Sequence, residues 1–216
     1  MELCINTVME VVEIPPPLFK RNVMQNDKPT ISVVIIDSRS HTNPEWVEKA
    51  IDSVREQSLE NIELIILDNK ERNRSIGRLY NQGIEEAKAD WVYLLGDDDY
   101  ISPDFLASIK TFIDKFADED VVMCSTYSTF FDDEKKIMSA KTKSPFGCCR
   151  KSYFLEHKFD ETLVNYIDVD AYARLKEDGK KMIACKWHFG YYYRQHNDNV
   201  SGRKEITPKQ EVAIDR

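Results

Sequence analysis

The chain has 216 residues, of which 42% are hydrophobic and 31% are charged, and its formal net charge is −8 at pH 7. This length predicts one domain with enough apolar material for a core, and the composition excludes a disordered or fibrous chain. A nonspecific nucleic-acid binder needs a basic surface, so the acidic balance argues against nucleic acid as a partner.

No apolar run in the sequence is long enough to span a bilayer. The longest runs, at 33–36 and 64–67, fall far short of the roughly 20 residues that a membrane helix needs. The N-terminus has neither the basic region nor the uninterrupted apolar region of a secretory signal. The 5 cysteines show no zinc-binding spacing. We therefore expect a reduced, cytoplasmic chain without an integral membrane segment, and contact with a membrane surface stays open.

The two ends of the chain differ from its middle. Three consecutive prolines at 15–17 break any helix or strand, and a polar stretch follows them. We predict an N-terminal arm at 1–30 lying on the domain, a domain at 31–202 with halves at about 31–128 and 129–202, and a C-terminal tail at 203–216.

From residue 31 onward, apolar strands alternate with amphipathic helices. The pattern predicts strands at 31–36, 62–67, 91–95 and 121–127, and helices at 44–57, 75–87 and 105–116. Asn43 before Pro44 is a helix start signal, and Ser102 to Asp104 provide another. The alternation predicts an α/β fold with a mostly parallel central sheet and helices on both faces.

The second half is less regular. It predicts short strands around a polar turn at 132–134, a loop through 145–147, helices near 151–157 and 169–177, and an aromatic strand at 189–193. We expect this half to form a smaller layer packed on the same sheet.

Acidic residues follow three of the predicted strands. Asp37 follows the first strand, Asp68 the second, and Asp97, Asp98 and Asp99 the third. In parallel α/β sheets, ligands bind beyond the carboxyl ends of the strands, although aspartate is also common there as a turn former. Three adjacent carboxylates repel one another unless a divalent cation binds between them, and oxygen ligands suit Mg²⁺ or Mn²⁺. A surface acidic turn is the alternative.

Glycine-rich phosphate loops are missing from the sequence, which has neither G-x-x-x-x-G-K-[ST] nor G-x-G-x-x-G. A metal held by carboxylates would then have to neutralise bound phosphates. This combination indicates a nucleoside diphosphate bound through the ion.

Taken in order, these segments give the chain a resemblance to the GT-A-fold glycosyltransferases, family 2 in particular, over about 31–202. The matching pieces lie at 31–36, 63–69, 81–84, 91–99, 159–161, 167–168, 174–175 and 192–196. The resemblance implies a GT-A (Rossmann-like) fold with an acceptor-side second half. It also implies sugar transfer, with inversion, from a nucleoside-diphosphate donor, UDP by preference, to a hydroxyl of a glycan, glycolipid or glycoprotein.

The same resemblance implies roles for the acidic run. Asp97, Asp98 and Asp99 look like the DxD motif of the family, in which one carboxylate contacts the ribose and another binds the metal. We assign Asp97 to the ribose and Asp98 to Mn²⁺ or Mg²⁺, with Asp99 replacing or assisting Asp98.

The base and ribose pocket departs from the usual family pattern. Asp68 matches the residue that reads the base, but Asn69 and Lys70 follow it where the family has Asp-Gly. Asp37 and Ser38 stand where the family usually has Pro-Thr, and we assign both to the donor pocket.

An inverting displacement needs a general base, and Asp168 is the candidate. It matches the aspartate of the Glu-Asp motif of the family, with Ile167 in place of the glutamate. Asp170 is a competing carboxylate, and Asp168 could also cap the helix that follows it.

Cationic residues could meet the diphosphate. Arg74 or Arg78 would do so from the second helix, and His196 could bind the metal or the diphosphate. Solvated charges and a surface histidine are the alternatives. Together with Arg203 and Lys204, the segment around His196 could close over the donor as a lid, unless it is a frayed terminus.

Two rivals stay open at this point. One is a catalytically inert nucleotide-sugar or glycan-binding module of the same fold. The other is a nucleotidyltransferase, which would want a glycine-rich basic loop after the first strand, whereas 37–43 contains no glycine. The small size of the chain for this family also fits one domain of a longer polypeptide.

Overall fold

The computed structural model describes residues 28–38, 43–116, 118, 121–131, 137–143, 147–185 and 190–196. The elements follow one another as β1 (Ile31–Asp37), α1 (Pro44–Arg55), β2 (Ile62–Asp68), α2 (Ile76–Glu86), β3 (Trp91–Leu95), β4 (Tyr100–Ile101), α3 (Phe105–Phe116), β5 (Val121–Phe131), β6 (Ile137–Lys143), β7 (Cys148–Arg150), α4 (Lys151–Glu156), α5 (Ile167–Glu177), β8 (Lys181–Cys185) and β9 (Tyr191–Arg194).

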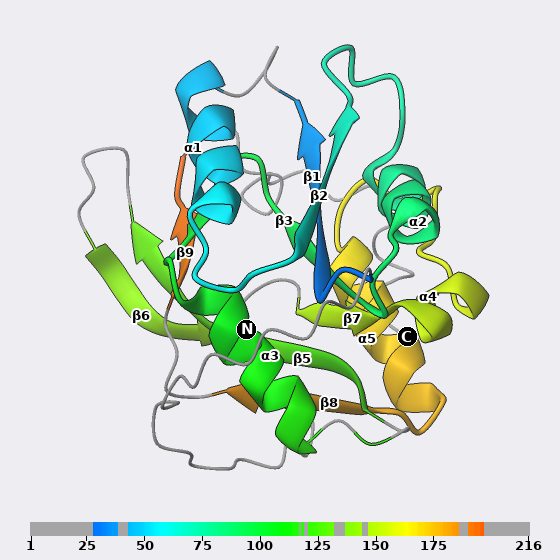
Figure 1. The fold of residues 1–216 in the computed structure, drawn as a ribbon. Helices are drawn as coiled ribbons and strands as arrows, with labels where there is room; N and C mark the ends of the chain where they lie inside the picture. The colour runs from blue at the N-terminus through cyan, green and yellow to red at the C-terminus, as the bar shows by residue number, and fades with distance from the viewer. Residues whose placement is uncertain are drawn as a thin grey trace.

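These strands form one sheet in the order β2-β1-β3-β7-β5-β9-β4, and β6 and β8 also pair with β5 (Figure 1). β1 is parallel to both β2 and β3, whereas β7 lies antiparallel between β3 and β5. The predicted α/β class is confirmed. The parallel pairing is limited to β2-β1-β3 and to β5 with β8 and β9, so the sheet as a whole is mixed.

Helices cover both faces of the sheet (Figure 1). α1 and α3 pack on one face, and α2, α4 and α5 pack on the other. β1 supplies side chains to both cores, because Val33 and Ile35 point to the first face and Val34 and Ile36 to the second. This burial on both sides explains the continuous apolar run at 33–36 within β1.

The start signal predicted at Asn43 and Pro44 is confirmed, and Ser75 caps α2 in the same way. The Asn43 side chain accepts a hydrogen bond from the backbone N–H of Glu45 at 3.0 Å, and Pro44 opens α1. The Ser75 hydroxyl accepts one from the backbone N–H of Arg78 at 3.3 Å at the start of α2. Each cap satisfies an amide that the first helical turn leaves without a partner.

Other boundaries differ from the prediction. The strand predicted at 121–127 continues to Phe131, and α5 begins at Ile167 rather than at 169. β4, β7 and β8 were not predicted, because such short strands show little periodicity, whereas β3, which is also short, was predicted from its continuous apolar sequence. The arm up to residue 27, the turn at 132–134, most of the loop at 145–147 and the tail at 203–216 lie outside the described residues.

Candidate active site

The carboxyl ends of β1, β2 and β3 bring several predicted site residues together. Asp37 and Asp68 are direct neighbours in the register of β1 and β2. The backbone N–H of Ser38 donates to the Asp97 carboxylate at 2.8 Å, which ties the end of β1 to the turn after β3. Asp37, Ser38, Asp68 and Asp97 therefore share one edge of the sheet.

A lysine joins this edge. The Lys70 ammonium lies 3.7 Å from the Asp37 carboxylate and 3.9 Å from that of Asp68. Asp37 is buried, whereas the Asp68 side chain is 69% exposed. The sequence showed Lys70 only as a departure from the family pattern, and its position between two carboxylates depends on the pairing of β1 with β2.

The two arginines predicted to meet a diphosphate have different surroundings. The Arg74 guanidinium donates to the backbone carbonyl of Asp68 and, at 3.2 Å, to the side-chain oxygen of Gln82. It thereby connects the end of β2 to α2. Arg78 is exposed on the first turn of α2.

The turn after β3 is tightly built around Asp99. One oxygen of this buried carboxylate accepts the backbone N–H of Arg194 at 2.8 Å, and the other accepts the Tyr191 hydroxyl. A Cβ atom at Gly96 would lie 2.9 Å from carboxylate oxygens of both Asp98 and Asp99. Asp99 thus joins the turn to β9, and a side chain at Gly96 would disturb it.

The Asp98 carboxylate instead meets His196. Their Oδ2 and Nε2 atoms are 2.9 Å apart, and the histidine side chain is 9% exposed. The ring of Trp46 from α1 lies against His196, with centroids 4.8 Å apart. The Arg194 guanidinium lies over two rings, 4.4 Å from the centre of the Trp46 ring and 4.6 Å from that of Phe131. Its Nε also donates a hydrogen bond to the backbone carbonyl of Asp98.

This cluster joins residues that are far apart in the sequence. Trp46 was not predicted as a site residue, because nothing local in the sequence links it to His196. Of the cations predicted to close over the donor, Arg194 and His196 lie at the turn, and Arg203 and Lys204 lie outside the described residues.

Crowding of the carboxylates affects their ionisation. Burial, followed by the neighbouring charge of Asp98, raises the pKa of Asp97 to about 7. The same two causes raise the pKa of Asp99 well above its usual range. The turn therefore binds protons unless other positive charge is present. Within the described ranges, no group of three or more His, Cys, Asp or Glu side chains is arranged to hold a metal ion.

Asp168 and Asp170 lie in the first turn of α5 but have different partners. The buried Asp170 carboxylate forms an ion pair with Arg174, at 2.9 Å from its Nε. Asp168 is half-buried, and burial raises its pKa to about 6 against the opposing effect of the backbone N–H groups of Val169 and Asp168. The cap residue of α5 is Tyr166, so Asp168 is not the cap.

Contacts with α2 hold the segment that leads to α5. Asn81 accepts from the backbone N–H of Phe159 at 2.9 Å and donates to its carbonyl at 3.0 Å. A Cβ atom at Gly77 would lie 2.6 Å from the Asp160 carbonyl oxygen, and one at Gly83 would lie 2.5 Å from a methyl group of Val34. These close approaches explain why the matching pieces at 81–84 and 159–161 need those residue types.

Tyr80 on α2 is buried, and its ring lies 5.6 Å from that of Phe159. Burial raises the pKa of this phenol far above its usual value, and the charges of Asp168 and of Asp97 to Asp99 raise it further.

Comparison with known proteins agrees with this architecture. Residues 69–162 match the family model described as Glycosyl transferase family 2. The match covers somewhat less than half of the chain, and it shows that this segment is similar to glycosyltransferase family 2. Among curated relatives, the chain is 23% identical over 158 residues to EpsH of Bacillus subtilis (strain 168), which is named as a glycosyltransferase. The match covers 62% of this chain and 44% of EpsH.

Solved structures of S. aureus TarS share the fold. TarS 1–349 in complex with UDP-GlcNAc has a TM-score of 0.63 and 14% identity, covering 85% of this chain and 64% of that one. The complex with UDP also has a TM-score of 0.63 and 14% identity, with coverage of 86% and 63%. At this identity the similarity shows the fold alone. The chain spans 44% of EpsH and 37% of a longer TarS structure.

Two further observations concern membrane-spanning helices and cysteines. In the part of the chain that the structure describes, no helix has the length and apolar character to cross a membrane. Cys124, Cys148 and Cys149 are buried and form no disulfide among the described residues.

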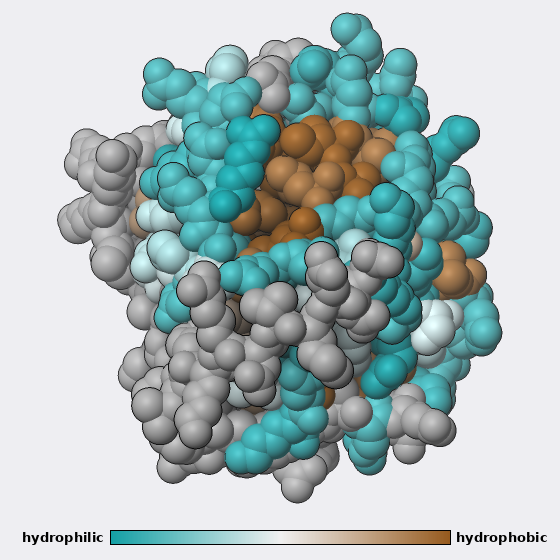
Figure 2. Space-filling view, in the orientation of Figure 1, coloured by the Kyte–Doolittle hydropathy of each residue, from teal (hydrophilic) through white to brown (hydrophobic). Residues whose placement is uncertain are grey.

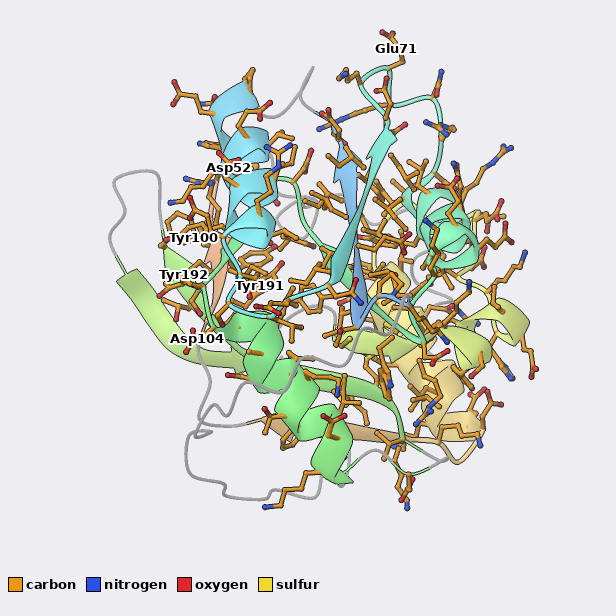
Figure 3. The ribbon with its side chains drawn as sticks, in the orientation of Figure 1. Asp52, Glu71, Tyr100, Asp104, Tyr191 and Tyr192 are labelled. Carbon is orange, nitrogen blue, oxygen red and sulfur yellow. The ribbon has the colours of Figure 1, made fainter. Side chains whose placement is uncertain are left out.

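A groove of about 790 Å³ runs along α1 on the side of β4 and β9. Asp52 from α1 and Tyr100 and Tyr192 from the two strands line it, as Figure 3 shows. The two tyrosine rings are stacked, with centroids 4.5 Å apart. None of the predicted donor, metal or base residues lines this groove.

Proposed function

We propose that this chain transfers a sugar, with inversion, from a nucleoside-diphosphate donor to a hydroxyl group of a glycan, glycolipid or glycoprotein acceptor. The observation that carries the proposal is the contact between Asp98 and His196 at the carboxyl end of β3. The match of 69–162 to the family 2 model and the solved TarS complexes with UDP and UDP-GlcNAc support a nucleotide-sugar donor, and we expect UDP to be the nucleotide.

The donor nucleoside would bind at the ends of β1 and β2. Asp68 is exposed enough to accept a hydrogen bond from the base, and Lys70 beside it can donate to a base carbonyl. Asp37 and Ser38 form the floor of this pocket. Asp97 would accept hydrogen bonds from the ribose hydroxyls, which favours its ionised form.

The residues at the turn fit a divalent cation. Asp98 and His196 supply one carboxylate oxygen and one imidazole nitrogen, and two protein ligands leave positions for diphosphate oxygens. The raised pKa values of Asp97 and Asp99 also show a turn short of positive charge. Mn²⁺ or Mg²⁺ bound there would stabilise the charge of the leaving diphosphate.

Asp99 is better suited to support this site than to bind the ion. Both of its carboxylate oxygens already accept hydrogen bonds from the protein. We therefore assign the ion to Asp98 and His196, with Asp99 as a positioning residue. Arg78 is exposed and can approach the diphosphate, while Arg74 holds the loop between β2 and α2.

Asp168 would accept the proton of the acceptor hydroxyl. A base with a pKa of about 6 is mostly ionised at neutral pH and is more basic than an ordinary aspartate. Asp170 cannot easily replace it, since its carboxylate is buried in the ion pair with Arg174.

Donor hydrolysis tests the proposal without knowledge of the acceptor. UDP-, GDP- and dTDP-linked sugars are incubated with the chain and Mn²⁺ or Mg²⁺, and release of the nucleoside diphosphate is measured. We expect slow, metal-dependent release from UDP-sugars, strongly reduced in Asp98→Ala and unchanged in Asp114→Ala, an exposed aspartate on α3. Binding of UDP without release or transfer would favour the inert module, and release of pyrophosphate from a nucleoside triphosphate would favour a nucleotidyltransferase.

A further inference from the structure

One aromatic side chain of α1, that of Trp46, does not belong to the core beneath this helix. Among the described residues, those that α1 contributes to this core are Val47, Ala50, Ile51 and Val54. The residues next to Trp46 on the helix surface, such as Glu45, are exposed, and Figure 2 shows the hydrophilic outer surface of α1 beside apolar surface over β1 and β2. Trp46 itself is half-buried, so its burial comes from contacts outside this core.

These contacts are made by the end of β9 and the residues that follow it. The His196 ring lies 4.8 Å from the Trp46 ring, and the Arg194 guanidinium lies 4.4 Å from the centre of the same ring. Between them, the backbone N–H of Gln195 donates to the carbonyl of Phe131 at 2.8 Å, which extends the pairing of β9 with β5. In an extended chain, side chains two positions apart lie on the same side, so one ring on α1 contacts both.

Arg194 connects this contact to the turn after β3 at two points. Its backbone N–H donates to the Asp99 carboxylate at 2.8 Å, and its Nε donates to the backbone carbonyl of Asp98 at 2.9 Å. The residue is buried, and its guanidinium lies over the rings of Trp46 and Phe131. A guanidinium is planar, so packing over two rings restricts its orientation and directs its hydrogen bonds. The position of the Asp98 backbone therefore depends on the packing of Arg194.

His196 is restrained by two contacts of its own. Its Nε2 lies 2.9 Å from the Asp98 carboxylate, and Trp46 lies against its ring. An imidazole binds an ion only through the lone pair in the plane of the ring, so the ring orientation decides whether Nε2 can act as a ligand. A contact that restricts the ring before the ion binds reduces the cost of ordering it afterwards.

We propose that Trp46 and Arg194 are positioning residues of the ion site. Trp46 holds the His196 ring with its Nε2 toward Asp98, and Arg194 holds the backbone of Asp98. This inference rests on the proposed function, because it takes Asp98 and His196 as the ligands of Mn²⁺ or Mg²⁺. The nucleoside pocket at the ends of β1 and β2 does not need this restraint. Loss of the Trp46 ring should therefore weaken only the part of UDP binding that depends on the ion.

Calorimetry of UDP with and without Mn²⁺ tests this inference. Trp46→Ala should lower the affinity measured with Mn²⁺ by about tenfold and leave the affinity without Mn²⁺ unchanged. Trp46→Phe keeps a ring against His196 and should restore most of the loss. Arg194→Lys keeps the charge but not the planar guanidinium, so it should reproduce the loss. Trp46→Leu, which keeps an apolar side chain but no ring, should do the same and replaces Trp46→Ala if that variant unfolds.

Tryptophan fluorescence supplies a readout that does not depend on turnover. Mn²⁺ is paramagnetic and quenches an indole close to it, whereas Mg²⁺ is not, so UDP with Mn²⁺ should quench the unsubstituted chain more than UDP with Mg²⁺. This difference should be largely lost in Trp46→Phe. Trp91→Phe is the matched control and should keep it, because Trp91 also lies under a guanidinium, that of Arg150 at 4.7 Å, but at the opposite end of β3 from the turn.

The outcomes separate this inference from the proposed function. If Trp46→Ala and Arg194→Lys both kept the full effect of Mn²⁺ on UDP affinity, the positioning role would be overturned and the proposed function would stand. A loss in Trp46→Ala that was equal with and without Mn²⁺ would also overturn the role, because it would show general damage to the domain. Equal UDP affinity with and without Mn²⁺ in the unsubstituted chain would remove the ion itself, and the inference with it.

Discussion

The turn after β3 and the first turn of α5 each contain two aspartates that differ in burial and in their partners, namely Asp98 and Asp99 in the turn and Asp168 and Asp170 in the helix. In each pair one carboxylate is buried and bonded to the protein, namely Asp99 to Tyr191 and Arg194, and Asp170 to Arg174. The other, Asp98 or Asp168, is only half-buried. In each pair, the buried aspartate holds the loop or helix in place through its hydrogen bonds or ion pair. The neighbouring aspartate, on the same loop or helix, stays partly exposed.

The largest expected effect separates the two aspartates of α5. Asp168→Asn keeps the shape of the side chain but removes its basicity, so sugar transfer should fall by roughly 10² to 10⁴ while UDP affinity stays nearly constant. Steady-state transfer rates and calorimetric UDP binding would measure this. If Asp170→Asn lost the chemistry and Asp168→Asn retained it, the two roles would have to be exchanged.

The next effect concerns the turn after β3. Asp98→Ala and His196→Ala should each weaken metal-dependent UDP binding by about tenfold or more, because each removes one of two proposed ligands. Calorimetry with UDP, with and without Mn²⁺, would measure the change. Asp98→Ala should leave the melting temperature unchanged or higher, since it relieves repulsion among the carboxylates. Unchanged affinity in both variants would remove the metal from this position.

Asp170 should matter for stability instead of binding. Asp170→Ala leaves Arg174 without its buried partner, and we expect a loss of about 3 kcal/mol in the free energy of unfolding. Urea denaturation would measure it, with Asp114→Ala as a control at an exposed pair on α3. A change no larger than that of the control would mean that the ion pair does not hold α5 in place.

The pH dependence of the rate gives the smallest predicted effect. Since burial raises the pKa of Asp168 to about 6 and the base acts in its ionised form, kcat/KM should rise with pH up to about 6 and level off above it. Near pH 5 the rate should be about tenfold lower than the plateau. Asp170→Asn should keep this profile. A plateau that extends down to pH 4 would argue against Asp168 as the base.

Local signals in the sequence determined much of the first half of the domain. Asn43 and Ser75 cap α1 and α2, and the apolar run of β1 is buried on both faces. Capping and periodicity depend on residues within a few positions of one another, so they can be read without the rest of the chain. The same reasoning placed acidic residues beyond the strand ends, because parallel strands end at one edge.

Only the tertiary structure decided which of these residues face one another. The Asp98 and His196 side chains meet across 98 positions in the sequence, and Trp46 reaches them from α1. The choice between neighbouring aspartates was equally hidden, because the buried Asp99 carboxylate accepts from Arg194 on β9, whereas the half-buried Asp98 carboxylate meets His196. Long-range packing leaves no periodic trace in the sequence, and it is this packing that gives the two neighbouring carboxylates their different partners.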